Sequence, residues 1–179
     1  TSLLIPNAFA SSFEKAGITV RTLGLERKPR NIGAVMTAGC RLRQRAKERQ
    51  ADIVHSHMVH GNLLTRLALA KSGARLICTI HNVTEGGKSR DLGYALTNWG
   101  ATLNTTISDA ATARFVGAHV LPKNTLTIYN GVDMSRFSPN SHKRGRNETF
   151  QWLAVGRLAP QKDYPTLLRA LALLPDSEL

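Results

Sequence analysis

The chain has 179 residues, 42% of them hydrophobic, and 24 basic against 12 acidic side chains give it a formal net charge of +12. This length suits one domain of about 150 residues and part of another, and no apolar run approaches the ~20 residues that span a bilayer. Cys40 and Cys78 are not spaced as a metal site or a disulfide framework, which indicates a reducing compartment such as the cytoplasm.

Apolar periodicity and turn residues predict an alternation of helices and strands. Helices are expected over 9–16, from a cap at Asn31 to about Gln50, over 62–71 and 90–99, from a cap at Ser108 to about Val116, and from Pro165 onward. Strands are expected at 18–23, 53–57, 75–80, 101–107, 126–129 and 150–155. This alternation is typical of a Rossmann-like parallel sheet with helices on both faces, so the predicted fold class is α/β.

Basic residues are concentrated near the N-terminus. Residues 1–50 carry ten basic and three acidic side chains, and Arg41, Arg45 and Arg49 fall on one helical face. Like charges four residues apart destabilise a helix by about 0.2–0.5 kcal/mol per pair. The face could be solvated, meet an anionic membrane surface, or bind nucleic acid. No aromatic residue interleaves with this run, which disfavours nucleic acid.

The stretch 149–174 predicts a strand, a tight turn at Gly156, a basic loop with Arg157 and Lys162, and a helix. Loops that leave a parallel strand and enter a helix are where α/β folds bind phosphates. The same two cations could instead be solvated charges on an ordinary turn. The polar residues 131–148 are expected to link a first domain over 1–130 to the start of a second over 149–179.

Histidines gather at the ends of two expected strands. His55 and His57 share one face of a strand, and His60 follows them. A metal site is conceivable, but spacing pairs no third ligand type with them, so we expect the lining of a cleft instead. His81 comes directly after strand 75–80, where a titratable group is placed to meet a substrate. A structural histidine, hydrogen-bonded at the strand end, is the alternative.

Further polar residues follow these strand ends. In the loop after His81, Asn82 is a candidate to line the cleft, and Glu85 is either a base or, as we favour, a loop charge. The glycines at 86–87 let the backbone approach a ligand. Ser108 is expected to cap its helix at the same sheet edge. Asn130 begins an Asn-Gly turn and is a further cleft candidate.

The motifs of common enzyme classes are missing. The sequence contains no G-x-S-x-G, Walker A, G-x-G-x-x-G or H-E-x-x-H pattern. Five segments, in order, instead resemble the retaining GT-B glycosyltransferases of family 4 (group 1); they are residues 52–68, 78–87, 104–116, 126–139 and 152–171. The H-N-x-x-E-G-G form at 81–87 is most similar to enzymes of bacterial surface polysaccharide assembly.

The resemblance implies two Rossmann-like domains of GT-B type facing each other across a cleft. The acceptor would bind the N-terminal domain, and the nucleotide-sugar donor, expected to be a UDP-sugar, mostly the C-terminal one. In the family the residues matching Gly156, Arg157 and Lys162 hold the donor diphosphate, and the histidine matching His81 sits beside the transferred sugar. No metal or other cofactor is implied. The expected enzyme is a hexosyltransferase that acts with retention on a saccharide or lipid-linked acceptor, in the cytoplasm or at the inner face of the membrane.

The chain departs from the family pattern at both ends. The family's first strand and Gly-rich loop are not found, its later acidic motif would lie beyond Leu179, and neither an initiator Met nor a signal peptide is present. We therefore expect a truncated piece that is nearly inactive by itself. Two other functions stay open: a catalytically silent binding or partner module of the same fold, and a basic nucleic-acid binder.

Overall fold

The computed structural model describes residues 10–25, 32–138 and 152–174. Its internal contacts divide the chain into two compact units, Thr1–Gly131 and Val132–Leu179. Each unit is described by itself below.

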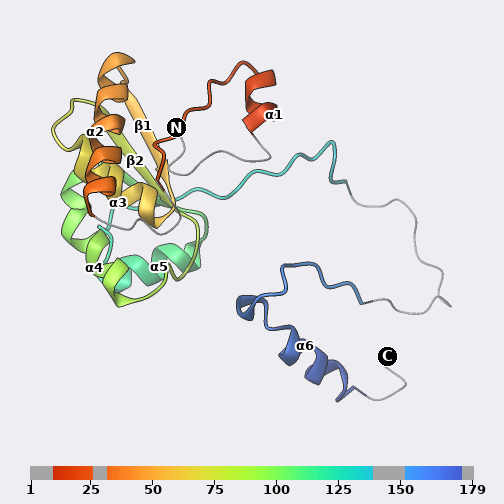
Figure 1. The fold of residues 1–179 in the computed structure, drawn as a ribbon. Helices are drawn as coiled ribbons and strands as arrows, with labels where there is room; N and C mark the ends of the chain where they lie inside the picture. The colour runs from red at the N-terminus through yellow and green to blue at the C-terminus, as the bar shows by residue number, and fades with distance from the viewer. Residues whose placement is uncertain (1–9, 26–31, 139–151, 175–179) are drawn as a thin grey trace. The chain divides into compact units, whose positions relative to one another are not determined.

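The first unit is built on a parallel four-stranded sheet with the strand order β1-β2-β3-β4. The strands are β1 (Ile53–His57), β2 (Arg75–Ile80), β3 (Leu103–Thr106) and β4 (Leu126–Thr127). The helices are α1 (Ala10–Lys15), α2 (Ile32–Glu48), α3 (Val59–Leu69), α4 (Lys88–Thr97), the short 3-10 helix η1 (Asn98–Gly100) and α5 (Asp109–Gly117). This is a Rossmann-like α/β fold, with the parallel sheet flanked by helices as predicted (Figure 1).

The main core lies where three helices meet the middle of the sheet. Ile80 of β2, Tyr94 of α4 and Phe115 of α5 are fully buried there. Val59 of α3 and Ala111 of α5 complete the contact. Because this core joins residues of β2, α3, α4 and α5, it fixes these elements relative to one another.

The basic residues of α2 contact backbone carbonyls of neighbouring segments. Arg41 donates to the carbonyl of Leu23 (3.1 Å) and Arg45 to that of Thr22 (2.8 Å). Arg43 donates to the carbonyls of Ala68 and Ala70, at the C-terminal end of α3. Cations are favoured at a helix C-terminus, so the bonds of Arg43 offset part of the repulsion along α2.

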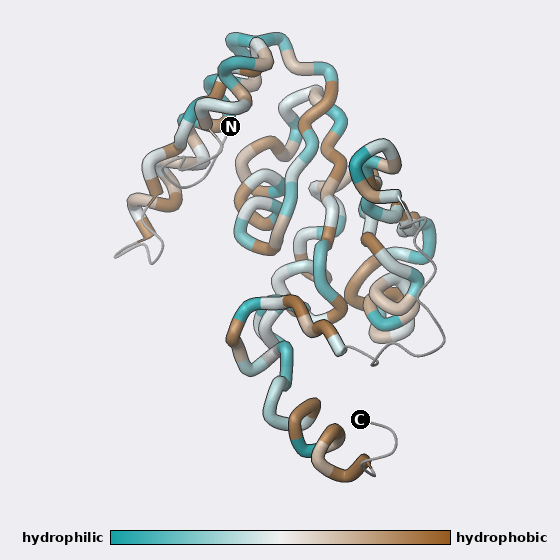
Figure 2. The backbone as a smooth tube through the Cα atoms, turned by 90° about the vertical axis from the view of Figure 1, so that its right-hand side faces the viewer, coloured by the Kyte–Doolittle hydropathy of each residue, from teal (hydrophilic) through white to brown (hydrophobic). Residues whose placement is uncertain are grey.

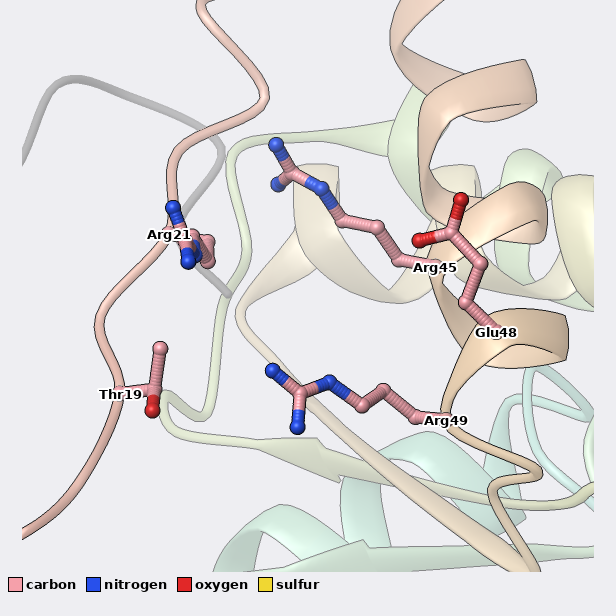
Figure 3. A pocket seen from close by; sticks show the side chains of 5 residues that line it. All are labelled: Thr19, Arg21, Arg45, Glu48 and Arg49. Atoms are coloured by element: carbon pink, nitrogen blue, oxygen red, sulfur yellow. The ribbon is translucent and has the colours of Figure 1, made fainter.

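A hollow of about 420 Å³ lies beside α2, between that helix and the segment 18–23 (Figure 3). Arg45 and Arg49 of the α2 region extend into it, and Arg21 and Thr19 line the other side, with Glu48 adding one carboxylate. Because β1 starts just after α2 ends, this hollow lies toward the amino ends of the strands, away from the edge where His57 and His81 lie.

Most predicted elements are confirmed, with shifted bounds. The strands 53–57 and 75–80 are found as predicted, whereas α3 and α4 begin earlier than expected, at Val59 and Lys88. The predicted strand 18–23 is wrong, because the segment forms only an isolated bridge at Thr22. Its apolar side chain Leu23 is buried against Ala38 and Leu64, and its carbonyls accept from the arginines of α2, so the segment packs on helices. The predicted cap Asn31 lies outside the described residues.

The second unit contains the 3-10 helix η2 (Pro160–Lys162) and helix α6 (Tyr164–Leu171). The helix predicted from Pro165 is thus confirmed. The strand predicted at 150–155 is wrong over its described part, because residues 152–155 are not in a strand. In the described part of this unit no strand pairs with residues 153–155, and Leu153 and Val155 are more than four-fifths exposed. Hydrophobic residues recur along α6 (Figure 2), where Leu168 is exposed.

None of the helices in the described segments has both the length and the apolar character required to cross a membrane.

Candidate functional site

Two histidines meet where β1 and β2 end. His57 is the last residue of β1, and His81 follows β2 directly. The carboxyl ends of parallel strands lie at one edge of a sheet, and here Nδ1 of His57 is 2.9 Å from Nε2 of His81. The structure therefore brings together two of the histidines selected from the sequence, at the edge where α/β folds bind ligands.

A row of polar side chains continues from His57 across the sheet. Ser56 bonds to Asn62 of α3 and so faces the helices, which places His55 and His57 on the opposite face of β1. The His55 ring lies 4.1 Å from that of His57, centroid to centroid, and its Nε2 is 2.7 Å from the hydroxyl of Thr79. That hydroxyl is in turn 2.7 Å from the hydroxyl of Thr105. Side chains of three strands thus fix the position of His55.

The surroundings of His57 favour its neutral form. Partial desolvation of the ring, followed by the charges of His55 and His81, lowers the pKa of His57 below its usual value.

His60, in the first turn of α3, is exposed. In the described segments no three His, Cys, Asp or Glu side chains are grouped so that they could hold a metal ion. The absence of a metal from the reaction stays a prediction.

The loop after His81 folds back on α4. Glu85 was expected to be a loop charge, and it lies in the loop but is only 4% exposed. Its carboxylate accepts from the hydroxyl of Tyr94 (3.1 Å) and from the amide of Asn82 (3.4 Å). Its backbone carbonyl accepts from Arg90 (2.6 Å). With both carboxylate oxygens engaged, Glu85 anchors the loop that carries His81 and is poorly placed to act as a base.

A buried polar network connects this anchor to the sheet. Asn62 donates to the hydroxyl of Tyr94 (3.1 Å) and to the carbonyl of Thr79 (2.9 Å), and it accepts from Ser56. Burial, the largest effect, raises the pKa of Tyr94, which keeps its hydroxyl protonated as a donor to Glu85. Asn62, Tyr94 and Ser56 were not selected from the sequence.

One signal for this network was present in the sequence. Val59, Asn62, Arg66 and Leu69 recur at spacings of three and four, and all four are buried on one face of α3. A polar residue at a core-facing position needs a buried partner. Asn62 and Arg66 therefore indicated that polar groups lie beneath this helix.

Two further residues were expected to line the cleft, Ser108 and Asn130, and they lie after β3 and β4. Ser108 caps α5 as predicted, with its hydroxyl accepting from the backbone N–H of Ala111 at 3.3 Å. Asn130 is exposed. Near it, the hydroxyl of Tyr129 donates to Asp109 in the first turn of α5. That bond lowers the pKa of Asp109 and raises the pKa of Tyr129.

The residues expected to hold a diphosphate lie in the second unit. Arg157 is exposed, and Lys162 is the last residue of η2. A Cβ atom at Gly156 would lie 2.9 Å from the hydroxyl of Tyr164 and 3.4 Å from Cδ of Lys162. Gly156 therefore allows the side chains of Lys162 and Tyr164 to pack closely on the backbone at the turn.

The glycine at position 86 gives a first testable prediction. Gly86 has φ +99°, and a Cβ there would overlap the guanidinium of Arg90. We expect Gly86→Ala to lower the free energy of unfolding by about 1–3 kcal/mol, measured by urea denaturation. The matched control is Gly61→Ala in α3, where a Cβ meets nothing within 4 Å, and which should be neutral or stabilising by up to about 1 kcal/mol. Equal effects of the two changes would contradict a strained loop at Gly86.

In a comparison with known protein families, the chain matches one family. Residues 4–136 of the chain match the family described as Glycosyltransferase Family 4. The match covers β1 to β4 and includes His57, His81 and the loop between β2 and α4. The search of individually characterised proteins gives no match.

Proposed function

The chain belongs to glycosyltransferase family 4, and from this premise we propose that it serves the transfer of a sugar, with retention, from a nucleotide-sugar to a saccharide or lipid-linked acceptor. The observation that carries the proposal is the pairing of His57 with His81 at the carboxyl edge of the sheet, inside the region that matches the family. We propose a GT-B arrangement for the complete enzyme and a UDP-sugar as the donor.

The proposed reaction needs positive charge rather than an enzyme nucleophile. The bond between the sugar and the diphosphate breaks, the acceptor oxygen bonds to the anomeric carbon, and the acceptor proton passes to an oxygen of the departing diphosphate. The developing charge of the leaving group must be stabilised in the transition state. Arg157 and Lys162 are exposed on one short turn, and both can donate hydrogen bonds to phosphate oxygens. We propose that these two residues bind the diphosphate and that no metal ion is required.

His81 is assigned to the sugar. It is half-buried and follows β2 directly, and one nitrogen of its ring is held by His57. A ring held in this way can hydrogen-bond a sugar hydroxyl in a fixed direction. Asn82 and Ser108 follow neighbouring strand ends and are proposed to line the same edge. A lipid-linked acceptor would bring the enzyme to the inner face of a membrane, where the exposed Arg21 and Arg49 could meet anionic headgroups.

The test is nucleotide release from a panel of nucleotide-sugars by the full-length protein, with and without EDTA. We expect release with one donor, at a rate that EDTA does not change. His81→Asn should lower kcat at least about 100-fold, because the sugar is then misplaced. The matched control is His119→Asn, because His119 is an exposed residue beyond the end of α5. Normal folding without release from any donor would favour a silent module, and unchanged release by His81→Asn would exclude His81 from the site.

A further inference from the structure

The contact between His57 and His81 constrains where their protons can be. An imidazole N–H can donate only to a lone pair, so one of the two facing nitrogens carries hydrogen and the other does not. Two neutral rings satisfy this condition, and so do one neutral and one cationic ring. Two cationic rings do not, because both facing nitrogens would then be donors. The contact at 2.9 Å therefore requires at least one neutral histidine.

We propose that His57 is a positioning residue that fixes the ring orientation and the tautomer of His81. Only the consequence for catalysis rests on the proposed function, because the pairing itself is a property of the two rings. With Nε2 of His81 occupied by His57, the nitrogen that His81 can present to a substrate hydroxyl is Nδ1. A fixed tautomer decides whether that nitrogen accepts or donates a hydrogen bond.

His57 is suited to this task because its own position is fixed. It is the last residue of β1, in register with Thr79 of β2. The His55 ring lies against it, tilted by 41°, and is itself held by the hydroxyl of Thr79. The row formed by Thr105, Thr79 and His55 thus supports His57 from three strands. A side chain supported in this way loses little conformational entropy when it orients a second ring.

The charged groups around the pair favour a neutral His57. On its own strand it faces His55, and from the end of β2 it faces His81. Glu85 is in the same loop as His81, but its carboxylate is engaged by Tyr94 and Asn82. His60, on α3, is exposed. Because two neighbouring imidazoles and partial desolvation oppose a positive charge on His57, this ring is the neutral partner that the contact requires.

The pairing can be tested without any substrate, by nitrogen NMR of the histidine rings in this chain near pH 7.5. The Nδ1 and Nε2 resonances of His81 should be widely separated, as in a single tautomer. In His57→Phe, which keeps a ring and removes both nitrogens, they should move toward their average. In His57→Asn, whose amide can reach the position of Nδ1, the separation should be at least half restored. The histidine-specific control is His119→Asn, which should leave the His81 resonances unchanged.

Folding is checked separately from pairing. The methyl resonances of Ile80 and Val59 in the main core should be unchanged in both His57 variants. A normal core with unchanged His81 resonances in His57→Phe would overturn the inference. If His57→Phe loses its core signals, His57→Asn decides alone: in a folded Asn variant the two His81 resonances must keep at least half of their separation, and fully averaged resonances would reject the pairing.

Enzyme kinetics tests whether the contact between His57 and His81 contributes to sugar transfer. In the full-length protein, His57→Phe should lower kcat at least about tenfold with little change in the donor KM, and His57→Asn should recover part of the loss. Failure of the parent protein to transfer sugar would reject the proposed function and leave the NMR result standing. Averaged His81 resonances in an active parent protein would reject the pairing alone.

Discussion

Arg66→Ala is expected to lower the free energy of unfolding of the first unit by about 3–5 kcal/mol, a loss typical of breaking a buried charged network. Arg66 is fully buried. It donates to the carbonyl of Tyr94 (3.0 Å), to the hydroxyl of Thr97 (3.1 Å) and to the side-chain oxygen of Asn104. Its guanidinium carbon also lies 4.8 Å from the centre of the Tyr94 ring. Truncation would remove the bond to the side-chain oxygen of the buried Asn104, at about 1–3 kcal/mol, and the packing over the Tyr94 ring, whereas the Thr97 hydroxyl still donates to the carbonyl of Gly93.

The partners of Arg66 explain how a buried cation is tolerated. In the described part of the chain its hydrogen-bond partners are uncharged oxygens, and its Nε has none. A negative charge in the same network is the carboxylate of Glu85, which is bound to the hydroxyl of the Tyr94 ring over which Arg66 lies. Arg66 thus joins α3, α4 and β3 and packs over the Tyr94 ring, whose hydroxyl binds Glu85 in the loop that carries His81, so its loss should also loosen that loop.

Urea denaturation followed by circular dichroism would measure the effect of Arg66→Ala. The control is Arg49→Ala, in which an exposed arginine is lost near the end of α2 and the expected change is within about 0.5 kcal/mol. Because folded domains are stable by only about 5–15 kcal/mol, Arg66→Ala should also lower the melting temperature by roughly 10 °C or more. A loss below about 1 kcal/mol would show that water replaces the guanidinium without cost.

Local sequence patterns predicted the sheet and its connections. The run RLICTI is apolar and β-branched and is found as β2, and Ser108 at the start of its helix is found as the cap of α5. The predicted strand 18–23 also alternates, but it forms a single bridge at Thr22 and its side chains and carbonyls contact α2, because a strand needs consecutive pairs along a neighbour. For residues 153–155 such a neighbour is missing in the described part of the second unit. Alternation identifies residues able to form a strand, whereas pairing depends on distant segments.

The candidate site was predictable where it depends on strand order. His57 and His81 end adjacent parallel strands, so their proximity follows once β1 and β2 are recognised. The burial of Glu85 was not predictable in the same way. A carboxylate beside two glycines is usually solvated, and it becomes buried here because Tyr94 returns on α4 to bind it. Charges become buried through partners remote in the sequence, and a single sequence read by spacing does not reveal those partners.

Arg157→Gln and Lys162→Gln are each expected to lower kcat/KM for the nucleotide-sugar by about 100-fold in the full-length protein. Removing one donor to a developing oxyanion costs this much in well-studied enzymes, and each glutamine keeps a polar chain while losing the positive charge. Both residues are exposed, in a turn that precedes α6. Folding should therefore be preserved, and the free energy of unfolding should change by less than about 0.5 kcal/mol.

The double variant distinguishes a shared diphosphate from two independent contacts. If both cations act on one leaving group, the combined loss should be clearly smaller than the product of the single losses, because groups that act as a unit are not additive. The matched control is Arg169→Gln, an exposed arginine of α6 whose side chain contacts Thr166, and it should keep kcat/KM within about twofold. Binding of UDP, followed by calorimetry, should weaken in parallel in the two single variants. Parental kcat/KM in both would remove Arg157 and Lys162 from the donor site and return them to the role of solvated turn charges.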